Sequence, residues 1–275
     1  MGVIRKDFTA TILAAYGGFM ATPSIESRSA ATAVIVRDMA DGPAQILMME
    51  RAGTMAFAAG ALVFPGGAID QADRDLAEAM SGTGPLEETA ARIAAIRETL
   101  EESGLAIGFS TPLDPAQAYE MRDALLRGVS LSAILQSHRL DLALDQLMPF
   151  SRWHPGGAEM AMRVYDTRFY LVRAPEGQDA SVDATENVRL FWKSAQDTID
   201  LCDAGGGRII FPTRRNLERL ALFDSFDAMS AHAASFPVEK VCPWVEERGG
   251  ECHLCIPDHL GYPITSEPMD RVQRG

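Results

Sequence analysis

The chain has 275 residues, of which 47% are hydrophobic and 23% charged, and its formal net charge at pH 7 is −13. This length and apolar content suffice for a sizeable core in one large domain. The acidic balance offers no basic stripe for nucleic acid or an anionic membrane, and no run approaches the ~20 apolar residues of a membrane span. Four cysteines are too few for a disulfide framework. We therefore expect a cytoplasmic protein that binds neither nucleic acid nor membrane.

The first third of the chain predicts a leader followed by short strands. Residues 1–28 have the composition of a loosely attached leader, and short apolar runs at 33–36 and 46–49 are bounded by turn formers, as strands are. A further strand-like run, 61–64, leads through a proline into Gly66 and Gly67. A tight turn at this glycine pair would let the backbone approach a ligand closely. The following segment, 71–84, is predicted as a helical turn plus loop.

An acidic helix follows, with Gly84 as its cap and Pro85 at its first position. Its carboxylates occupy positions i, i+3 and i+4 and so share one face, while its isoleucine and leucine side chains share the opposite face. We expect the apolar face to enter the core and the carboxylates to point outward. Like charges at this spacing destabilise a helix by roughly 0.2–0.5 kcal/mol per pair, and a hard divalent cation would reverse that sign. The residues are Glu98, Glu101 and Glu102 on one face and Ile93, Ile96 and Leu100 on the other.

The second half of the chain alternates helical and strand patterns. Leu, Ile and Ala at helical spacing predict two helices, Pro115–Arg127 with Asp114 as N-cap and Leu131–Leu147. Strands are predicted at 160–172 and 187–192. Thr213 is expected to cap a last helix, which carries Leu217 and Leu220.

Together the glycine turn and the acidic helix resemble the signature of the Nudix hydrolases. That signature is a Gly, five residues, a Glu, seven residues, and then Arg-Glu-hydrophobic-x-Glu-Glu-x-Gly-hydrophobic. Gly67 matches its opening, and six positions match its closing half: Arg97, Glu98, Glu101, Glu102, Gly104 and Leu105.

The chain departs from the signature in its spacing. The family places Gly and Arg 14 positions apart, whereas Gly67 and Arg97 are 30 apart, which implies an insertion of 16 residues. Counting back from Arg97 puts Thr89 where the first Glu of the signature belongs, with Glu87 and Glu88 beside it. Those two glutamates either replace the missing one or only favour the helix dipole.

An interrupted signature resembles the branch that includes the peroxisomal coenzyme A diphosphatase. The resemblance implies an α+β fold, a Nudix-type α/β/α sandwich around a mixed sheet, with an insertion inside the signature and an added helical segment. We expect the leader at 1–28, the Nudix domain at 29–235 with its helical insertion at about 114–147, and a C-terminal extension at 236–275. A homodimer is compatible with this organisation.

The resemblance also implies the site. Glu98, Glu101, Glu102 and the backbone of Gly67 would hold Mg²⁺ or Mn²⁺, and a metal-bound water would attack a diphosphate linkage. Arg97, off the carboxylate face, is expected to organise the site. The general base is expected to be one of these glutamates or a carboxylate of a later loop, where Glu186 and Asp183 are candidates. Predicted substrate contacts are Arg51, Gly66, Gly67, Trp153, Arg163 and Arg168. For Trp153 the alternative is packing, and for Arg163 and Arg168, which flank Asp166, it is structural ion pairs.

The substrate is predicted to be a small nucleoside diphosphate derivative, with coenzyme A or an acyl derivative as the first candidate. Arg51 and Gly60 match a motif of the coenzyme A diphosphatases, but Phe57 and Ala58 stand where that motif places a basic residue and a histidine. ADP-ribose, a dinucleotide or a nucleotide sugar therefore remains an alternative. A catalytically silent nucleotide-binding module is the third, because Thr89 replaces an acidic residue.

Overall fold

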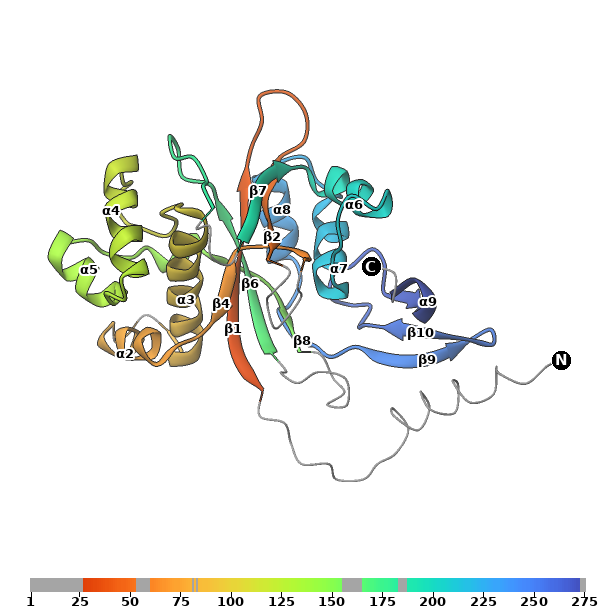
Figure 1. Ribbon diagram of the computed structural model, residues 1–275. Helices are drawn as coiled ribbons and strands as arrows, with labels where there is room; N and C mark the ends of the chain where they lie inside the picture. The colour runs from red at the N-terminus through yellow and green to blue at the C-terminus, as the bar shows by residue number, and fades with distance from the viewer. Residues whose placement is uncertain are drawn as a thin grey trace.

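The computed structural model describes residues 27–52, 60–80, 82, 84–154, 165–182 and 187–272, which form an α/β/α sandwich. The predicted fold class is confirmed. A mixed sheet stands in the middle, with α2 to α5 packed on one face and α6 to α8 on the other (Figure 1). The strands of the main sheet are β1 Arg28–Arg37, β2 Gln45–Arg51, β3 Leu62–Val63, β4 Gly66–Ala68, β5 Met148–Trp153, β6 Tyr165–Arg173, β7 Asn187–Lys193 and β8 Lys240–Val241.

Strand β1 organises this sheet. Its first half pairs antiparallel with β4, its last two residues pair antiparallel with β2, and its whole length pairs parallel with β6. The register places Ala31 beside Gly67 on one side and beside Arg168 on the other. The glycine turn is therefore fixed to the centre of the sheet, one strand away from β6.

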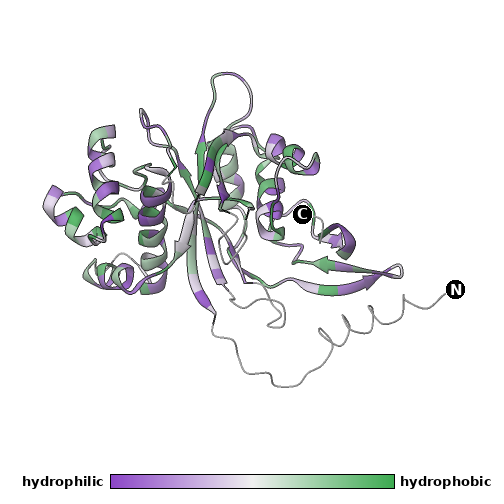
Figure 2. Cartoon of the chain, viewed as in Figure 1, coloured by the Kyte–Doolittle hydropathy of each residue, from purple (hydrophilic) through white to green (hydrophobic). Residues whose placement is uncertain are grey.

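Alternate residues of β1 enter two separate cores, as the period of a strand requires. Ala31, Ala33 and Ile35 pack beneath α3, whereas Val34 and Val36 pack toward α7 and α8. In Figure 2 the strands between the two helical layers are largely green, and the outer helices carry purple on their free sides. Apolar burial on both faces is thus what holds the layers together.

Besides the helix predicted over Pro115–Arg127, which ends one residue earlier at Leu126, the helices of the structure differ from their predicted bounds in four places. They are α2 Gln71–Ala79, α3 Leu86–Ser103, α4 Pro115–Leu126, α5 Leu131–His138, α6 Ala195–Asp203, α7 Phe211–Leu220, α8 Phe226–Ala234 and α9 Met269–Val272, with a 3₁₀ turn at Leu144–Gln146. The insertion, predicted as a turn plus loop, holds the nine-residue helix α2. Helix α3 begins one residue later than predicted, because Pro85 is its N-cap.

The other two differences concern α5 and α7. The predicted second helix reaches Leu147, but α5 ends at His138, after which Arg139 adopts a φ of 55°. Beyond it Leu142 bridges to Phe109, and leucines that alternate there along the chain are typical of extended backbone. Helix α7 begins at Phe211 rather than after a Thr213 cap, since a proline in the first turn removes an N–H that has no partner in the helix anyway.

The C-terminal extension forms a small sheet and adds to the second core. The strands β9 Trp244–Arg248, β10 Glu251–Cys255 and β11 Ser266–Pro268 make a separate antiparallel sheet. Val241, in β8, pairs with Trp153 of β5 at the edge of the main sheet. Ile256, Leu260 and Tyr262 are buried against the α7 layer. Residues 1–26 of the predicted leader lie outside the described residues, and its last residue, Arg28, already belongs to β1. In the part of the chain that is described, no helix combines the length and hydropathy needed to cross a bilayer.

Candidate active site

The glycine turn and the acidic helix meet in the structure. The backbone N–H of Gly66 donates to Oε2 of Glu102 at 2.8 Å, across 36 positions of sequence. Gly67 packs so closely on Glu98 that a Cβ built there would lie 2.4 Å from Oε1 of that carboxylate. A Cβ on Gly66 would in turn lie 2.3 Å from the carbonyl oxygen of Ala31. Neither position has room for a side chain, which explains the paired glycines.

The carboxylates do not point outward to solvent as predicted. Glu102 is 5% exposed, and the side chains of Glu98 and Glu101 are 17% and 25% exposed. Helix α3 is covered by the sheet on one side and by α2 and α4 on others, so its acidic face lies against β4 rather than in water. Burying three like charges is unfavourable without compensation, and the compensation comes from Arg97.

Arg97 is surrounded by acceptors, as its predicted organising role requires. Its Nε and Nη2 donate to the two oxygens of Asp73, both at 2.9 Å, and Nη2 also donates to the carbonyl of Ala68. Its Nη1 donates to Glu98 at 2.9 Å and to Glu101 at 3.1 Å. Burial opposes the guanidinium charge, but the Asp73 hydrogen bonds and the surrounding carboxylates outweigh it and raise the pKa of Arg97.

The carboxylates that Arg97 contacts carry more charge than one guanidinium balances. Burial raises the pKa of Glu98 to about 7, partly offset by Arg97 and reinforced by Glu101. Burial likewise raises the pKa of Glu101, again against the opposing charge of Arg97. Burial is the main cause for both groups, and a positive charge beside them would favour the ionised carboxylates. The cluster is therefore a place where one more cation would be stabilised.

Asp73 is the residue that sequence reasoning missed. It is 2% exposed, lies in the first turn of α2, and accepts from the N–H of Asp70 at 2.9 Å as part of a capping box. Counting forward from Gly67, it follows five intervening residues, where the signature has its first acidic residue. Counting backward from Arg97 leads instead to Thr89, which is buried in α3. The inserted residues therefore lie between Asp73 and Arg97.

Glu87 and Glu88 belong to other ion pairs. Glu87 pairs with Arg74 at 2.9 Å. Glu88 accepts from the hydroxyl of Tyr170 at 3.0 Å and pairs with Arg168 at 3.4 Å. Neither carboxylate contacts Arg97 in these pairs, so neither replaces the first acidic residue of the signature.

The predicted substrate contacts are scattered. Trp153 is 2% exposed and its indole N–H reaches Tyr262 and Asn216, so it fits the packing alternative and presents no face on which a base can stack. Arg168, whose side chain is 13% exposed, pairs with Glu88 on the α3 side of the sheet. Arg51 ends β2. Arg163, Asp183 and Glu186 lie outside the described residues. Asp166 pairs with Arg152 and Lys240, both at 2.7 Å, rather than with Arg168.

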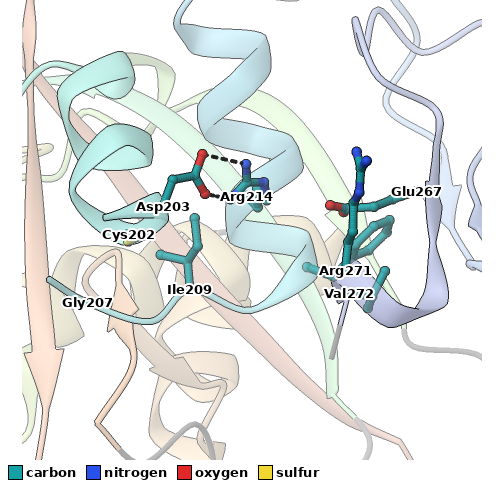
Figure 3. Close-up of a pocket in the computed structure, with 9 residues that line it drawn as sticks. Cys202, Asp203, Gly207, Ile209, Arg214, Glu267, Arg271 and Val272 are labelled. Carbon is teal, nitrogen blue, oxygen red and sulfur yellow. Dashed lines mark hydrogen bonds and ion pairs between the residues drawn. The ribbon is translucent and has the colours of Figure 1, made fainter. Parts of the chain in front are cut away.

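A cavity of about 290 Å³ lies elsewhere, between α6, α7 and the C-terminal α9 (Figure 3). Two of its charged side chains pair with each other, since Arg214 holds both oxygens of Asp203 at 2.7 and 3.0 Å. A third, Glu267, accepts from Arg215 outside the lining at 3.1 Å. It is on the opposite face of the sheet from α3. The uncompensated acidic charge is at the glycine turn, and we place the candidate site there.

Comparisons with known proteins relate the chain to one family of hydrolases. No protein-family model matches the chain. A Caenorhabditis elegans protein described as a nudix hydrolase is 24% identical over 243 residues, which span 83% of this chain and 76% of that protein. The crystal structure of a NUDIX hydrolase from Alicyclobacillus acidocaldarius superposes with a TM-score of 0.64 at 28% identity, over 74% of this chain and 96% of that one. The chain is thus similar to Nudix hydrolases both in sequence and in fold.

Nudix hydrolases generally use divalent metals, and such an ion needs a set of oxygen ligands. Among the described residues, no three His, Cys, Asp or Glu side chains are grouped as a ready-made metal site. Arg97 instead spans Glu98 and Glu101 and takes one oxygen of each. The donor chemistry nevertheless fits a hard cation, because carboxylate oxygens and a glycine backbone are what Mg²⁺ and Mn²⁺ prefer. The acidic excess around Arg97 fits as well.

Proposed function

We propose that this Nudix hydrolase is a metal-dependent diphosphatase acting on a nucleoside diphosphate derivative. The observation that carries the proposal is the convergence of the glycine turn on the acidic helix, with Gly66 bound to Glu102 and Gly67 against Glu98. The reaction adds one water across a phosphoanhydride P–O–P linkage and yields two phosphate esters. Bound Mg²⁺ or Mn²⁺ would lower the pKa of water and neutralise charge on the phosphoryl oxygens.

The chain's own residues would divide the work. Glu98, Glu101 and Glu102 would hold the cation, with the backbone of Gly67 beside them. Arg97, tied to Asp73 by two hydrogen bonds, keeps Glu98 and Glu101 in place when the cation is absent. Its fixed fork limits how far either carboxylate can turn. Glu186 and Asp183 remain our candidates for the general base, and Arg51, Arg163 and Arg168 for phosphate contacts.

Coenzyme A or an acyl-coenzyme A is our first substrate proposal. Its support is the interrupted signature, together with the match of Arg51 and Gly60 to the motif of the coenzyme A diphosphatases. ADP-ribose, a dinucleotide or a nucleotide sugar would use the same chemistry. A silent binding module is the weakest alternative. It is motivated by the uncharged Thr89, but Asp73 is an acidic residue that pairs with Arg97.

A substrate panel tests the proposal. Purified chain is incubated with Mg²⁺ or Mn²⁺ and each of coenzyme A, acetyl-coenzyme A, ADP-ribose, diadenosine polyphosphates and nucleotide sugars, and products are identified by mass spectrometry. We expect metal-dependent cleavage of a phosphoanhydride, with 4′-phosphopantetheine and adenosine 3′,5′-bisphosphate from coenzyme A. Turnover only of other substrates would remove the coenzyme A proposal. No metal-dependent turnover of any of them would contradict the diphosphatase itself.

A further inference from the structure

The end of α3 needs partners from outside the helix. The last four carbonyls of any α-helix have no partner further along the same helix. Here the carbonyl of Leu100 accepts from the N–H of Gly104, which adopts a φ of 75° and closes the last turn. The next three carbonyls belong to Glu101, Glu102 and Ser103, and two of these residues are proposed cation ligands. What binds these carbonyls therefore sets the position of the ligands.

One side chain takes two of the three carbonyls. Arg122, on α4, donates from Nε to the carbonyl of Glu101 at 3.0 Å and from Nη2 to the carbonyl of Glu102 at 3.2 Å. It is 7% exposed. A guanidinium at this end of a helix also complements the negative end of the helix dipole. A Cβ at Gly104 would lie 3.1 Å from Nη1 of Arg122, so the glycine of the signature also makes room for this arginine.

The third carbonyl is bound by the segment that precedes β7. The N–H of Ser181 donates to the carbonyl of Ser103 at 2.8 Å. Arg122 holds the same serine, donating from Nη1 to its hydroxyl at 2.7 Å and from Nη2 to its carbonyl at 2.9 Å. Ser181 stands two positions before Asp183 and five before Glu186, the candidate bases. One arginine thus joins the acidic helix to the start of that segment.

We infer that Arg122 is a positioning residue for Glu101 and Glu102, and that the added α4–α5 segment is therefore part of the active-site framework. The inference rests on the proposed function, because it concerns the proposed cation ligands. Glu102 must meet Gly66 and Glu101 must meet Arg97 from the same helical turn, so a small rotation of that turn would move both carboxylates. Groups that orient metal ligands typically change metal affinity 10- to 100-fold when altered.

The test compares two lysine substitutions on one helix. Arg122→Lys keeps the charge but loses the planar fork, so it can no longer hold both carbonyls and Ser181 together. Arg127→Lys, at the end of α4, alters an exposed pair with Asp123 and is the matched control. Binding of Mn²⁺ without substrate is measured by electron paramagnetic resonance, with kcat and KM on the best substrate of the panel. For Arg122→Lys we expect a Mn²⁺ Kd roughly tenfold higher and a lower kcat at similar KM, with both unchanged in the control.

The possible outcomes distinguish a positioning role of Arg122 from a purely structural cap of α3. A lower melting temperature with wild-type Mn²⁺ Kd and kcat would overturn the inference and leave Arg122 a structural cap. If Arg122→Lys does not fold, Ser181→Ala removes one acceptor of Arg122 and should shift the Mn²⁺ Kd in the same direction; an unchanged Kd there would overturn it too. Wild-type chain that binds Mn²⁺ but hydrolyses nothing would refute the proposed function, and the Kd comparison would still decide on Arg122. Wild-type chain that binds no Mn²⁺ would overturn both.

Discussion

Two arginine–carboxylate clusters occupy opposite faces of the sheet, one on α3 and one on α7. On α3, Arg97 contacts four carboxylates, those of Asp70, Asp73, Glu98 and Glu101. On α7, two neighbouring arginines, Arg214 and Arg215, share another three. These belong to Asp203, Glu218 and Glu267.

The charge balance separates a structural cluster from a binding cluster. Arg219, the third arginine of α7, lies 4.6 Å from the ring centre of Phe150 and 5.4 Å from that of Tyr262. Arg219 contacts these aromatic rings and not the carboxylates, so two cations face three anions on α7, whereas one cation faces four anions on α3. The α3 cluster keeps an acidic excess beside a glycine backbone. We therefore propose that the α7 cluster stabilises the fold and that the α3 cluster is the cation site.

The same substitution in both clusters should have opposite effects. Glu98→Gln removes a proposed cation ligand and one of several crowded negative charges, so we expect hydrolysis to fall by orders of magnitude with little change in melting temperature. Glu218→Gln leaves Arg214 and Arg215 short of one buried carboxylate. We expect it to lower the free energy of unfolding by about 3 kcal/mol and to leave kcat unchanged. Steady-state kinetics and urea unfolding measure the two effects.

Reversal of that pattern would break the comparison. Wild-type activity in Glu98→Gln would remove Glu98 from the site. Loss of activity in correctly folded Glu218→Gln would show that α7 contributes directly to the chemistry.

Asp73→Asn tests the link between the insertion and the α3 cluster. Asp73 is 2% exposed and holds Arg97 by two hydrogen bonds, so loss of its charge should cost about 3 kcal/mol of unfolding free energy and reduce activity. Asp75→Asn, an exposed position on the same helix, is the control. Equal stability and activity of the two variants would mean that Glu98 and Glu101 suffice to hold Arg97.

Gly67→Ala tests the contact between the glycine turn and α3. Gly67 is not among the glycines that require a positive φ, so its backbone accepts alanine. The added Cβ would nonetheless press on the Glu98 carboxylate and turn it away. We expect roughly tenfold weaker Mn²⁺ binding by electron paramagnetic resonance, with a near-normal melting temperature. Unchanged Mn²⁺ binding would exclude close approach of Gly67 to the cation.

The smallest expected effect is a pH-dependent change in stability, on the α7 side of the sheet. His232 lies between Phe223 and Phe236, and burial together with the charge of Arg219 lowers its pKa below the ordinary 6.5. The unfolded chain then takes up this proton more readily than the folded chain does, so the contribution of His232 to stability is complete above pH 6.5 and declines as the pH falls below it. Melting temperatures at pH 7.5 and 5.5 should differ less in His232→Gln than in wild type. An equal difference would exclude His232 as the cause.

The elements that carry the signature are predictable because their signals are local. Paired glycines after an apolar run, and glutamates at helical spacing, depend on neighbours a few positions away. The N-cap of α4 at Asp114 is likewise correct, since a capping side chain bonds to its own helix. For the same reason the amino-acid sequence is sufficient to assign Arg97 and its neighbouring glutamates Glu98 and Glu101 to one cluster.

The features that were not predicted depend on contacts between residues that are far apart in the sequence. Asp73 is separated from Arg97 by the whole insertion, and Arg122 reaches α3 from a helix added after the signature. The burial of the acidic face is also not encoded in helical periodicity, because it results from β4 and α2 folding over that face. Trp153 is not a stacking surface for the same reason: Tyr262 covers it from more than a hundred residues away.

Crystals grown with Mn²⁺ would test the central claim most directly. Anomalous diffraction locates the ion without reference to activity. We predict a peak between the backbone of Gly67 and the carboxylates of Glu98, Glu101 and Glu102, with Arg97 retained on Asp73. Mn²⁺ bound elsewhere while those carboxylates stay paired only with Arg97 would contradict the account.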